Sequence, residues 1–229
     1  MFITEIFKSI QGESSYAGLP CIFVRLTGCN LRCKWCDTAY AFHGGAKYGL
    51  DEVLKRVSEF SCDEEENGGR NIRLVEITGG EPLLQPETPE LARQLLDLGY
   101  TVLIETSGER DISTLPREVV KIVDVKCPDS GESGRFNLTN LEALEQKDEI
   151  KFVIASRRDY DFARKFMTEH RLRDRVEEIL FSPVFADPAG TWPAMDARSL
   201  AEWILAENLP VRLGLQLHKF VWDPAMHGV

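Results

Sequence analysis

Residues Gly28–Asp37 read GCNLRCKWCD, and this stretch carries three cysteines in the spacing C-x3-C-x2-C. Cys29, Cys33 and Cys36 can face one centre only if the backbone folds around it. The glycine and asparagine beside Cys29 suit the unusual dihedral angles that such a fold requires. Thiolates are the usual ligands of iron–sulfur clusters, and three cysteines for four irons would leave one iron open. The stretch therefore predicts a cluster whose open iron binds and reduces a small molecule.

Two alternatives explain these cysteines less well. A structural zinc site needs four protein ligands, often as two paired knuckles. The fourth ligand would be His43, Cys62 or Cys127, and none of them forms a paired knuckle. A redox C-x2-C pair leaves Cys29 without a role. The other cysteines are interpreted as ordinary residues, with Cys21 in a strand, Cys62 in a surface loop and Cys127 just after a strand.

Outward from the cysteine stretch, short apolar runs alternate with helical patterns. The predicted strands are Cys21–Leu26, Arg73–Ile77, Thr101–Glu105, Val119–Val125, Glu149–Ile154, Glu178–Ser182 and Val211–Leu217. The predicted helices are Leu50–Phe60, Thr88–Leu98, Tyr160–His170 and Ala197–Glu207. Continuous apolar runs suit strands that are covered on both faces, as in parallel sheets. The alternation predicts an α/β fold with parallel βαβ units, in an open or closed barrel.

The connecting segments give no sign of a boundary between domains. No internal repeat or Pro- and Gly-rich linker is present, so residues 1–229 are expected to form a single domain. The stretch between Cys29 and Lys47 has no clear period and is expected to be a long loop, and loops of that length are often functional. Ser61–Arg70 and Asp129–Gly134 are expected to be solvated loops.

A second motif directly follows the strand RLVEI. Thr78–Pro82 reads TGGEP, which predicts a tight turn from a strand into a helix. Glycines without side chains also let a ligand approach the backbone closely. The turn is thus a candidate ligand-binding segment on the βα unit after the cysteine stretch.

The bulk composition excludes several classes of protein. The 229 residues carry a formal net charge of -10, which argues against a nucleic-acid binder that neutralises phosphates. The N-terminus lacks a secretory signal, and no apolar run approaches the roughly 20 residues that span a bilayer. A cytoplasmic protein without a membrane partner is expected. In that reducing compartment, clustered cysteines favour metal ligation over disulfides.

The two motifs together resemble the radical S-adenosylmethionine superfamily. Most of the chain further resembles the 7-carboxy-7-deazaguanine synthase family of queuosine biosynthesis. The matching segments are EIFKSIQGE (5–13), the turn 18–20, VRLTGCNLRCKWCDT (24–38), TGGEPLLQ (78–85), ETSG (105–108), DVKCP (124–128), KFVI (151–154), SPV (182–184) and LQLHKF (215–220). The QGE and QLHK elements discriminate best, because most superfamily members lack both.

The resemblance implies an activity and a set of cofactors. The fold would be a modified partial (β/α) barrel with a mostly parallel sheet. The enzyme would be a carbon–nitrogen lyase that converts 6-carboxy-5,6,7,8-tetrahydropterin to 7-carboxy-7-deazaguanine and releases ammonia. Its cofactors would be a [4Fe–4S] cluster, S-adenosyl-L-methionine and Mg²⁺. An external electron donor such as flavodoxin or ferredoxin would reduce the cluster, and a homodimer is the family expectation.

The resemblance also implies roles for individual residues. Cys29, Cys33 and Cys36 would hold the cluster, and the Thr38 hydroxyl would bind Mg²⁺. The residues expected to meet the substrate are Gln11, Gly12, Glu13, Arg25, Thr78 and His218. Those expected to meet the cofactor are Gly79, Gly80 and Glu81 of the GGEP segment and, at strand ends, Glu105, Ser107, Lys126 and Ser182.

Structural alternatives remain open for several of these residues. Gln11–Glu13 could form a capped turn, and Asp37–Thr38 could be a simple turn. Arg25, at the end of an apolar strand, needs an anion, which could be the substrate carboxylate or a structural partner. His218, placed on the last strand, is a pocket residue or a core histidine. The tail after Pro224 and the segment FSPVFADP depart from the family pattern.

Two other functions compete with the synthase. A glycyl-radical-enzyme activase would use the same cluster and cofactor on a protein partner, but such activases lack the QGE element and the pterin-facing arginine. A non-catalytic zinc or cluster module would bind a partner and cleave no cofactor.

Overall fold

The computed structural model describes residues 1–61, 71–186, 190–192 and 194–229. Within these ranges, nine strands form one sheet in the order β3-β1-β2-β4-β5-β6-β7-β8-β9. β2 and β4 to β9 are parallel neighbours, whereas β1 runs antiparallel to both β2 and β3. The strands are β1 Phe2–Ile10, β2 Pro20–Leu26, β3 Ala46–Lys47, β4 Leu74–Gly79, β5 Thr101–Thr106, β6 Val120–Asp124, β7 Glu149–Ile154, β8 Glu178–Pro183 and β9 Arg212–Leu213.

The helices alternate with the parallel strands. They are α1 Leu50–Ser61, α2 Thr88–Asp97, α3 Arg157–Glu169, α4 Ala197–Ala206 and α5 His218–Val221. Short 3₁₀ helices cover Ala39–Phe42, Pro82–Leu84, Ile112–Thr114, Pro128–Ser130, Leu138–Glu142 and Leu172–Asp174. None of the helices in the described ranges is long and apolar enough to cross a bilayer.

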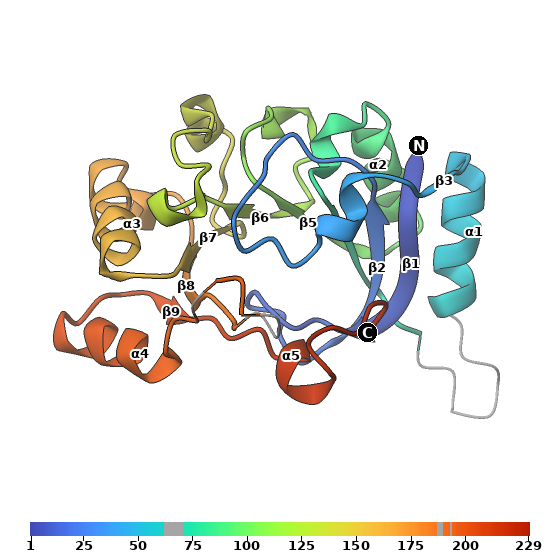
Figure 1. The fold of residues 1–229 in the computed structure, drawn as a ribbon. Coiled ribbons are helices and arrows are strands. Elements are labelled where there is room, and N and C mark those ends of the chain that lie inside the picture. The colour runs from blue at the N-terminus through green and yellow to red at the C-terminus, as the bar shows by residue number, and fades with distance from the viewer. Residues whose placement is uncertain (62–70, 187–189, 193) are drawn as a thin grey trace.

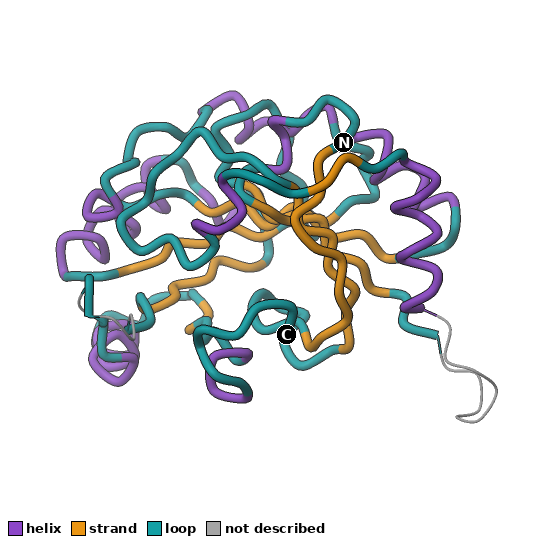
Figure 2. Tube along the Cα trace, turned by 45° about the vertical axis from the view of Figure 1, so that its right-hand side comes forward, coloured by secondary structure: helices purple, strands orange, loops and turns teal. Residues whose placement is uncertain are grey.

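The sheet curves but does not close, so the molecule is a partial (β/α) barrel, as the sequence predicts. Figure 1 and Figure 2 show the strands fanned along an arc, with α1, α2 and α3 on the outside. The larger core lies between the outer face of the sheet and these helices. On β4, Val75 and Ile77 belong to that core, together with Leu91 and Leu95 of α2. Burial of these apolar side chains fixes the helices on the sheet.

The inner face of the sheet carries the alternate residues of each strand, because side chains of a strand point to opposite faces in turn. A small apolar cluster fills its N-terminal half and includes Phe7, Cys21, Phe23, Leu74, Leu103, Val120 and Ile122. Two residues further along the same strands, the inner face becomes polar, as with Arg25 on β2 and Glu105 on β5. The chemistry of the molecule is therefore expected at the C-terminal ends of the strands.

Most predicted elements are confirmed, with shifted boundaries. The helix predicted to begin at Tyr160 begins earlier, at Arg157, because the Ser156 hydroxyl caps it by accepting from the Asp159 amide. β1 was not among the predicted strands. The stretch expected to be one long loop contains a short 3₁₀ helix and β3. The expected loop after Ser61, with Cys62, lies outside the described residues.

The prediction of a last strand over Val211–Leu217 is wrong for its second half. β9 ends at Leu213, and the Leu217 amide donates to the Gly12 carbonyl instead of to a neighbouring strand, at 2.8 Å. His218, placed on the last strand by the sequence analysis, therefore begins the short helix α5. This departure carries the C-terminal segment across the open side of the sheet, toward β1.

Candidate active site

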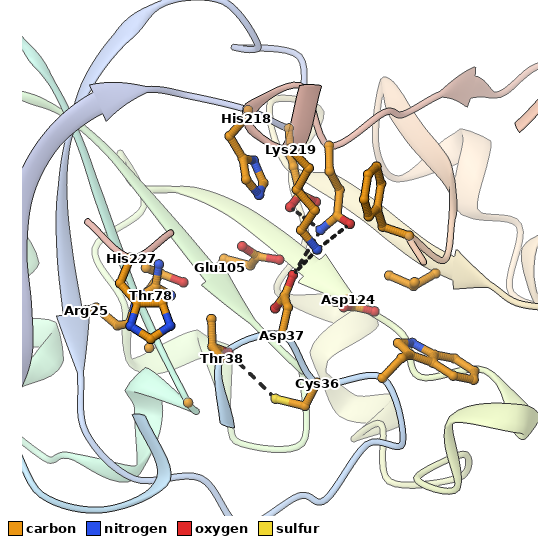
Figure 3. Close-up of a pocket in the computed structure, with 18 of the residues that line it drawn as sticks. Arg25, Cys36, Asp37, Thr38, Thr78, Glu105, Asp124, His218, Lys219 and His227 are labelled. Carbon is orange, nitrogen blue, oxygen red and sulfur yellow. Dashed lines mark hydrogen bonds and ion pairs between the residues drawn. The ribbon is translucent and has the colours of Figure 1, made fainter. Parts of the chain in front are cut away.

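One cavity of about 570 Å³ lies at the C-terminal ends of the parallel strands. The cysteine loop forms one wall, and the C-terminal segment forms another. The strands contribute charged or polar inner-face residues, which are Arg25, Glu76, Thr78, Glu105, Asp124 and Lys151. In α/β barrels this end of the strands is where ligands bind. Figure 3 shows how side chains from the loop, the strands and the C-terminal segment converge there.

The three predicted cluster ligands come together on this cavity. Cys29, Cys33 and Cys36 all line it, all are free thiols, and all are partly exposed. The Cys36 amide donates to the Cys33 carbonyl at 3.2 Å, which bends the loop between these two residues. By contrast, Cys21 and Cys127 are buried in the apolar cores, as expected for cysteines without a ligand role.

Hydrogen bonds to neighbouring loops give the cysteine loop its shape, because it has little regular structure of its own. The Arg32 amide donates to Glu132 at 2.6 Å, and the Lys34 amide donates to the Ser130 carbonyl at 3.0 Å. The Asn30 side chain donates to Glu109 at 2.8 Å. These partners follow β5 and β6, so the ends of the parallel strands position the loop.

The donor set fits an iron–sulfur cluster better than a single metal ion. Among the described residues, no three His, Cys, Asp or Glu side chains converge as the ligands of one ion would. In a cubane each thiolate binds a different iron, so the sulfurs need not converge on one point. Burial raises the pKa of the Cys33 thiol to about 11 and also raises the pKa of Cys29. Iron would therefore displace protons from these thiols when it binds.

The GGEP segment packs directly against the cysteine loop. The Glu81 amide donates to the Gly28 carbonyl at 2.8 Å, and the Gly80 amide donates to the Leu26 carbonyl at 3.2 Å. A Cβ atom on Gly80 would lie 2.3 Å from the Gly28 carbonyl oxygen and 2.7 Å from Cys29 Cβ. Glycine at position 80 is thus required for this close approach.

Glu81 does not reach the cavity, although the sequence analysis assigned it to the cofactor. Its carboxylate is fully buried and accepts hydrogen bonds from the Thr106 hydroxyl at 2.8 Å and from the Ser107 amide and hydroxyl at 2.8 and 2.6 Å. It therefore joins the end of β4 to the end of β5. Gly79, Gly80 and Ser107 do line the cavity.

Ser182 is also not brought to the cavity. It is buried on β8 and is not among the lining residues, and a Cβ atom on Gly214 would lie 2.7 Å from its hydroxyl oxygen. Its hydroxyl thus faces the β9 side of the sheet. The next segment of the chain, with Val184 and Phe185, lines the cavity in its place.

Arg25 and Thr78 are neighbours in the register of β2 and β4, and both line the cavity. The Arg25 Nε atom donates to Glu5 of β1 at 2.7 Å, and the Tyr40 hydroxyl donates to the same carboxylate oxygen at 2.8 Å. The structural ion pair that the sequence left open is therefore present. It engages one edge of the guanidinium group, and a guanidinium has donors on a second edge for another anion.

The turn Gln11–Glu13 lies at the opposite wall. The Gln11 side chain is 3% exposed, and both ends of its amide are engaged, by Glu76 and by the Glu13 amide. A Cβ atom on Gly12 would lie 2.1 Å from His218 Nδ1, so glycine lets the imidazole pack on the turn. The Glu13 carboxylate accepts from Lys151 at 3.0 Å and from Gln216 at 3.0 Å.

Lys151 of β7 is the central cation of the cavity floor, and the sequence analysis did not single it out. Its ammonium group is shared by Glu13 and Glu105. Burial alone would raise the pKa of Glu13, but Lys151 and His218 outweigh it and hold that pKa at about 2. Burial raises the pKa of Glu105 despite the same ammonium group. Burial lowers the pKa of His218, which favours the neutral imidazole.

An ion pair joins the cysteine loop to the C-terminal segment. Asp37, next to Cys36, accepts from Lys219 of α5 at 2.6 Å and from Gln216 at 3.2 Å. Burial would raise the pKa of Asp37, but Lys219 and Gln216 hold it well below its usual range. Figure 3 shows Asp37 directed toward Lys219, with Thr38 beside it near Cys36. The QLHK element thus meets the CDT element across the cavity.

Two further regions of the cavity contain the predicted residue Lys126 together with residues that the sequence analysis gave no role. Asp124 accepts from Lys126 at 2.6 Å, and both side chains line the cavity near Cys33. The tail after Pro224 also lines it, and the His227 ring stacks on Tyr40 with centroids 3.9 Å apart. Within the matching segment DVKCP the sequence analysis gave a role only to Lys126 and not to Asp124, and it noted the tail after Pro224 only as a departure from the family pattern.

Comparison with known proteins agrees with this arrangement. The model of the Radical SAM superfamily matches residues 23–128. The 7-carboxy-7-deazaguanine synthase of Koribacter versatilis is 54% identical over 100% of both chains, and that of Chlorobaculum tepidum is 41% identical over 99% of this chain and 96% of its own. The crystal structure of QueE from Escherichia coli superposes with a TM-score of 0.71 at 24% identity, covering 95% of this chain and 94% of that one.

The three-cysteine loop lies in the segment that matches the Radical SAM superfamily, and the partial barrel has the fold of QueE. The sequence identity to the named synthases extends over the full length of the chain and therefore identifies its family. The chain belongs to the 7-carboxy-7-deazaguanine synthase family.

The role of the cysteine loop predicts the effect of removing one thiol. Cys33→Ala should abolish the brown colour of the anaerobically reconstituted protein, because two thiolates cannot hold the cluster firmly. Cys127→Ala is the matched control, since Cys127 is buried in the apolar core, and it should retain the colour. Iron content and the visible absorption spectrum measure both outcomes. Full colour in Cys33→Ala would contradict the ligand assignment.

The contact between the GGEP segment and the cysteine loop gives a second prediction. Gly80→Ala should lower the amount of bound cluster at least several-fold, because the added methyl group displaces the Gly28–Cys29 backbone. Gly49→Ala is the control, since its Cβ atom would lie 3.6 Å from only the flexible end of Glu52. Iron and sulfide analysis after reconstitution gives the measurement. Equal occupancy in the two variants would show that the close approach is not needed.

Proposed function

We propose that this protein converts 6-carboxy-5,6,7,8-tetrahydropterin to 7-carboxy-7-deazaguanine with release of ammonia. The observation that carries the proposal is that the three cysteines and Arg25 line one cavity, so a cluster held by these cysteines would share that cavity with an anion site. The family membership supports the same reaction. When bound, the cluster and S-adenosyl-L-methionine supply the 5′-deoxyadenosyl radical, and the radical chemistry belongs to them.

The residues of this chain bind and orient the reactants. Arg25 is proposed to hold the substrate carboxylate with the guanidinium edge that Glu5 leaves free. Thr78, its neighbour on β4, would meet the same end of the substrate. Glu13 and the neutral imidazole of His218 are proposed to face the pterin ring. Gly12 contributes by letting His218 pack closely on the turn.

The cofactor is proposed to lie along the strand ends. Gly79 and Gly80 line the cavity, as Cys29 does, so their backbones would border the cofactor there. Glu105, Ser107 and Lys126 line the cavity between the cysteine loop and the sheet, where their side chains would contact the cofactor. Glu81 supports this wall by fixing Ser107, and acts there as a positioning residue.

Mg²⁺ is proposed to bind at the Thr38 hydroxyl. Thr38 lines the cavity, and its side chain makes no capping hydrogen bond to the short helix that follows it. The neighbouring Asp37 carboxylate is occupied by Lys219. One protein oxygen suits Mg²⁺, which keeps several waters and takes other oxygens from substrate. The substrate carboxylate on Arg25 would supply one of them.

The protein is further proposed to work in the cytoplasm as a homodimer, with flavodoxin or ferredoxin as electron donor. The free cysteines among the described residues suit a reducing compartment. Exposed apolar side chains on α5, including Phe220 and Val221, offer surface for pairing of two chains. The activase alternative is not favoured, because full-length relatives of this chain are named synthases and the C-terminal segment lines the cavity.

The test is an anaerobic assay of reconstituted protein with reductant, S-adenosyl-L-methionine and the carboxytetrahydropterin. The proposal predicts consumption of the pterin and formation of the deazaguanine acid. Deoxyadenosine formed without consumption of the pterin would point to an activase instead. The absence of any deoxyadenosine would favour a non-catalytic module.

The anion site at Arg25 gives a prediction of its own. Arg25→Ala should keep the cluster but raise KM for the pterin by about 10-fold or more, because a charge-assisted hydrogen bond to the carboxylate is lost. Arg73→Ala is the control, since the exposed Arg73 precedes β4 at its far end. Steady-state kinetics at saturating S-adenosyl-L-methionine give the comparison. An unchanged KM in Arg25→Ala would leave Arg25 only its ion pair with Glu5.

A further inference from the structure

The turn Gln11–Glu13 reaches into the cavity without regular secondary structure, so other elements must hold it. Its backbone is tied on two sides. Gln11 exchanges backbone hydrogen bonds with the Gly18–Leu19 turn, both at 2.8 Å. The Gly12 carbonyl accepts from the Leu217 amide at 2.8 Å. Neither contact reaches the Glu13 amide, which is held by the Gln11 side chain alone among the described residues.

The orientation of the Gln11 amide follows from what each partner can do. The Glu13 backbone N–H can only donate, so the atom that faces it at 2.5 Å must be Gln11 Oε1. The amide nitrogen Nε2 then faces the Glu76 carboxyl group, which accepts its hydrogen bond. Gln11 is therefore a bridge between β4 and the backbone of residue 13.

Glu76 is an unusual residue for its place on the sheet. It is 2% exposed on the inner face of β4, and its register neighbours on β2 and β5 are Phe23 and Leu103. None of the ion pairs in the described ranges includes it, whereas Glu13 and Glu105 share Lys151. Burial, reinforced by those two carboxylates, raises the pKa of Glu76 well above its ordinary value. Burying an acid that has no ion-pair partner lowers the stability of the fold, so an acid at this position indicates a functional reason.

We propose that Glu76 is a positioning residue of the substrate site, which holds the turn Gln11–Glu13 in its binding geometry through the Gln11 amide. The inference rests on the proposed function, because it takes this cavity as the pterin site. Without the acceptor at position 76, the buried Nε2 of Gln11 is left unsatisfied and turns away to find a partner. The Glu13 amide then loses its acceptor, and the Glu13 carboxylate loses its fixed place beside Lys151.

Two exchanges of acid and amide test the bridge. Q11E alone sets two carboxyl groups against each other, and at a pH above the raised pKa of Glu76 both are acceptors. In the double variant Q11E/E76Q, the amide at position 76 donates and the carboxylate at position 11 accepts, so the hydrogen bond is restored in the reverse direction. The second oxygen of the carboxylate at position 11 still accepts from the Glu13 amide. Side-chain volumes stay the same throughout. E76L removes the acceptor, while E76Q retains one, and E118L serves as a control at an exposed carboxylate.

Each variant is studied as reconstituted holoenzyme. The bridge predicts that Q11E and E76L raise KM for the pterin by about 10-fold or more. E76Q and the double variant should lie within about threefold of the parent, and E118L should match it. Deoxyadenosine formation without pterin should be unchanged in E118L, whose carboxylate is exposed. Hydrogen exchange of the amide at residue 13 should accelerate in Q11E and E76L and recover in the double variant.

The inference is overturned if the double variant binds the pterin as poorly as Q11E, or if E76L has the KM of the parent. The comparison of Q11E with Q11E/E76Q tests the bridge even if E76L lowers stability, because the double variant conserves side-chain volume and the hydrogen bond. The parent enzyme tests the proposed function separately. If it leaves the pterin unconverted, that proposal fails, whereas the exchange rates at residue 13 still test the bridge.

Discussion

The contact between the cysteine loop and the ends of the parallel strands is the constraint on which the site depends. The loop has little secondary structure, so hydrogen bonds to other segments must set the positions of its thiols. Glu81 shows how this works, because its amide holds the Gly28 carbonyl while its carboxylate fixes Ser107. The position of the loop is thereby fixed relative to the ends of β4 and β5. A preorganised ligand loop avoids the entropic cost of ordering it when the cluster binds.

A second consequence of the fold is the charge balance of the cavity. Alternate residues of the strands point inward, so apolar side chains near the strand starts give way to ionised ones near the strand ends. Lys151 holds two carboxylates together, and Lys219 joins the cysteine loop to α5 through Asp37. Arg25, paired with Glu5, is the inner-face cation of β2 beside Thr78. Each of these charged side chains thus has a partner of opposite charge, and Arg25 retains capacity for an anionic ligand.

Sequence alone predicts the parts of this structure that local patterns encode. The βα alternation and the C-x3-C-x2-C spacing give the class of fold and the three thiols. Tertiary contacts decide the rest. The last strand stops at Leu213, because the Leu217 amide pairs with Gly12 more than 200 positions away in the chain. Glu81 and Ser182 carry suitable side chains, but their neighbours turn them from the cavity. Lys151 and Glu76 lie on strands whose apolar runs gave no reason to single them out.

The measurement that tests the account most directly is Mössbauer spectroscopy of the anaerobically reconstituted protein, with and without S-adenosyl-L-methionine. A cubane held by Cys29, Cys33 and Cys36 has one iron without a protein thiolate. The account predicts a brown protein with four irons per chain, of which one changes its spectrum when the cofactor is added. A colourless protein that binds zinc would contradict the account, as would a cluster in which the spectrum of all four irons is unchanged by the cofactor.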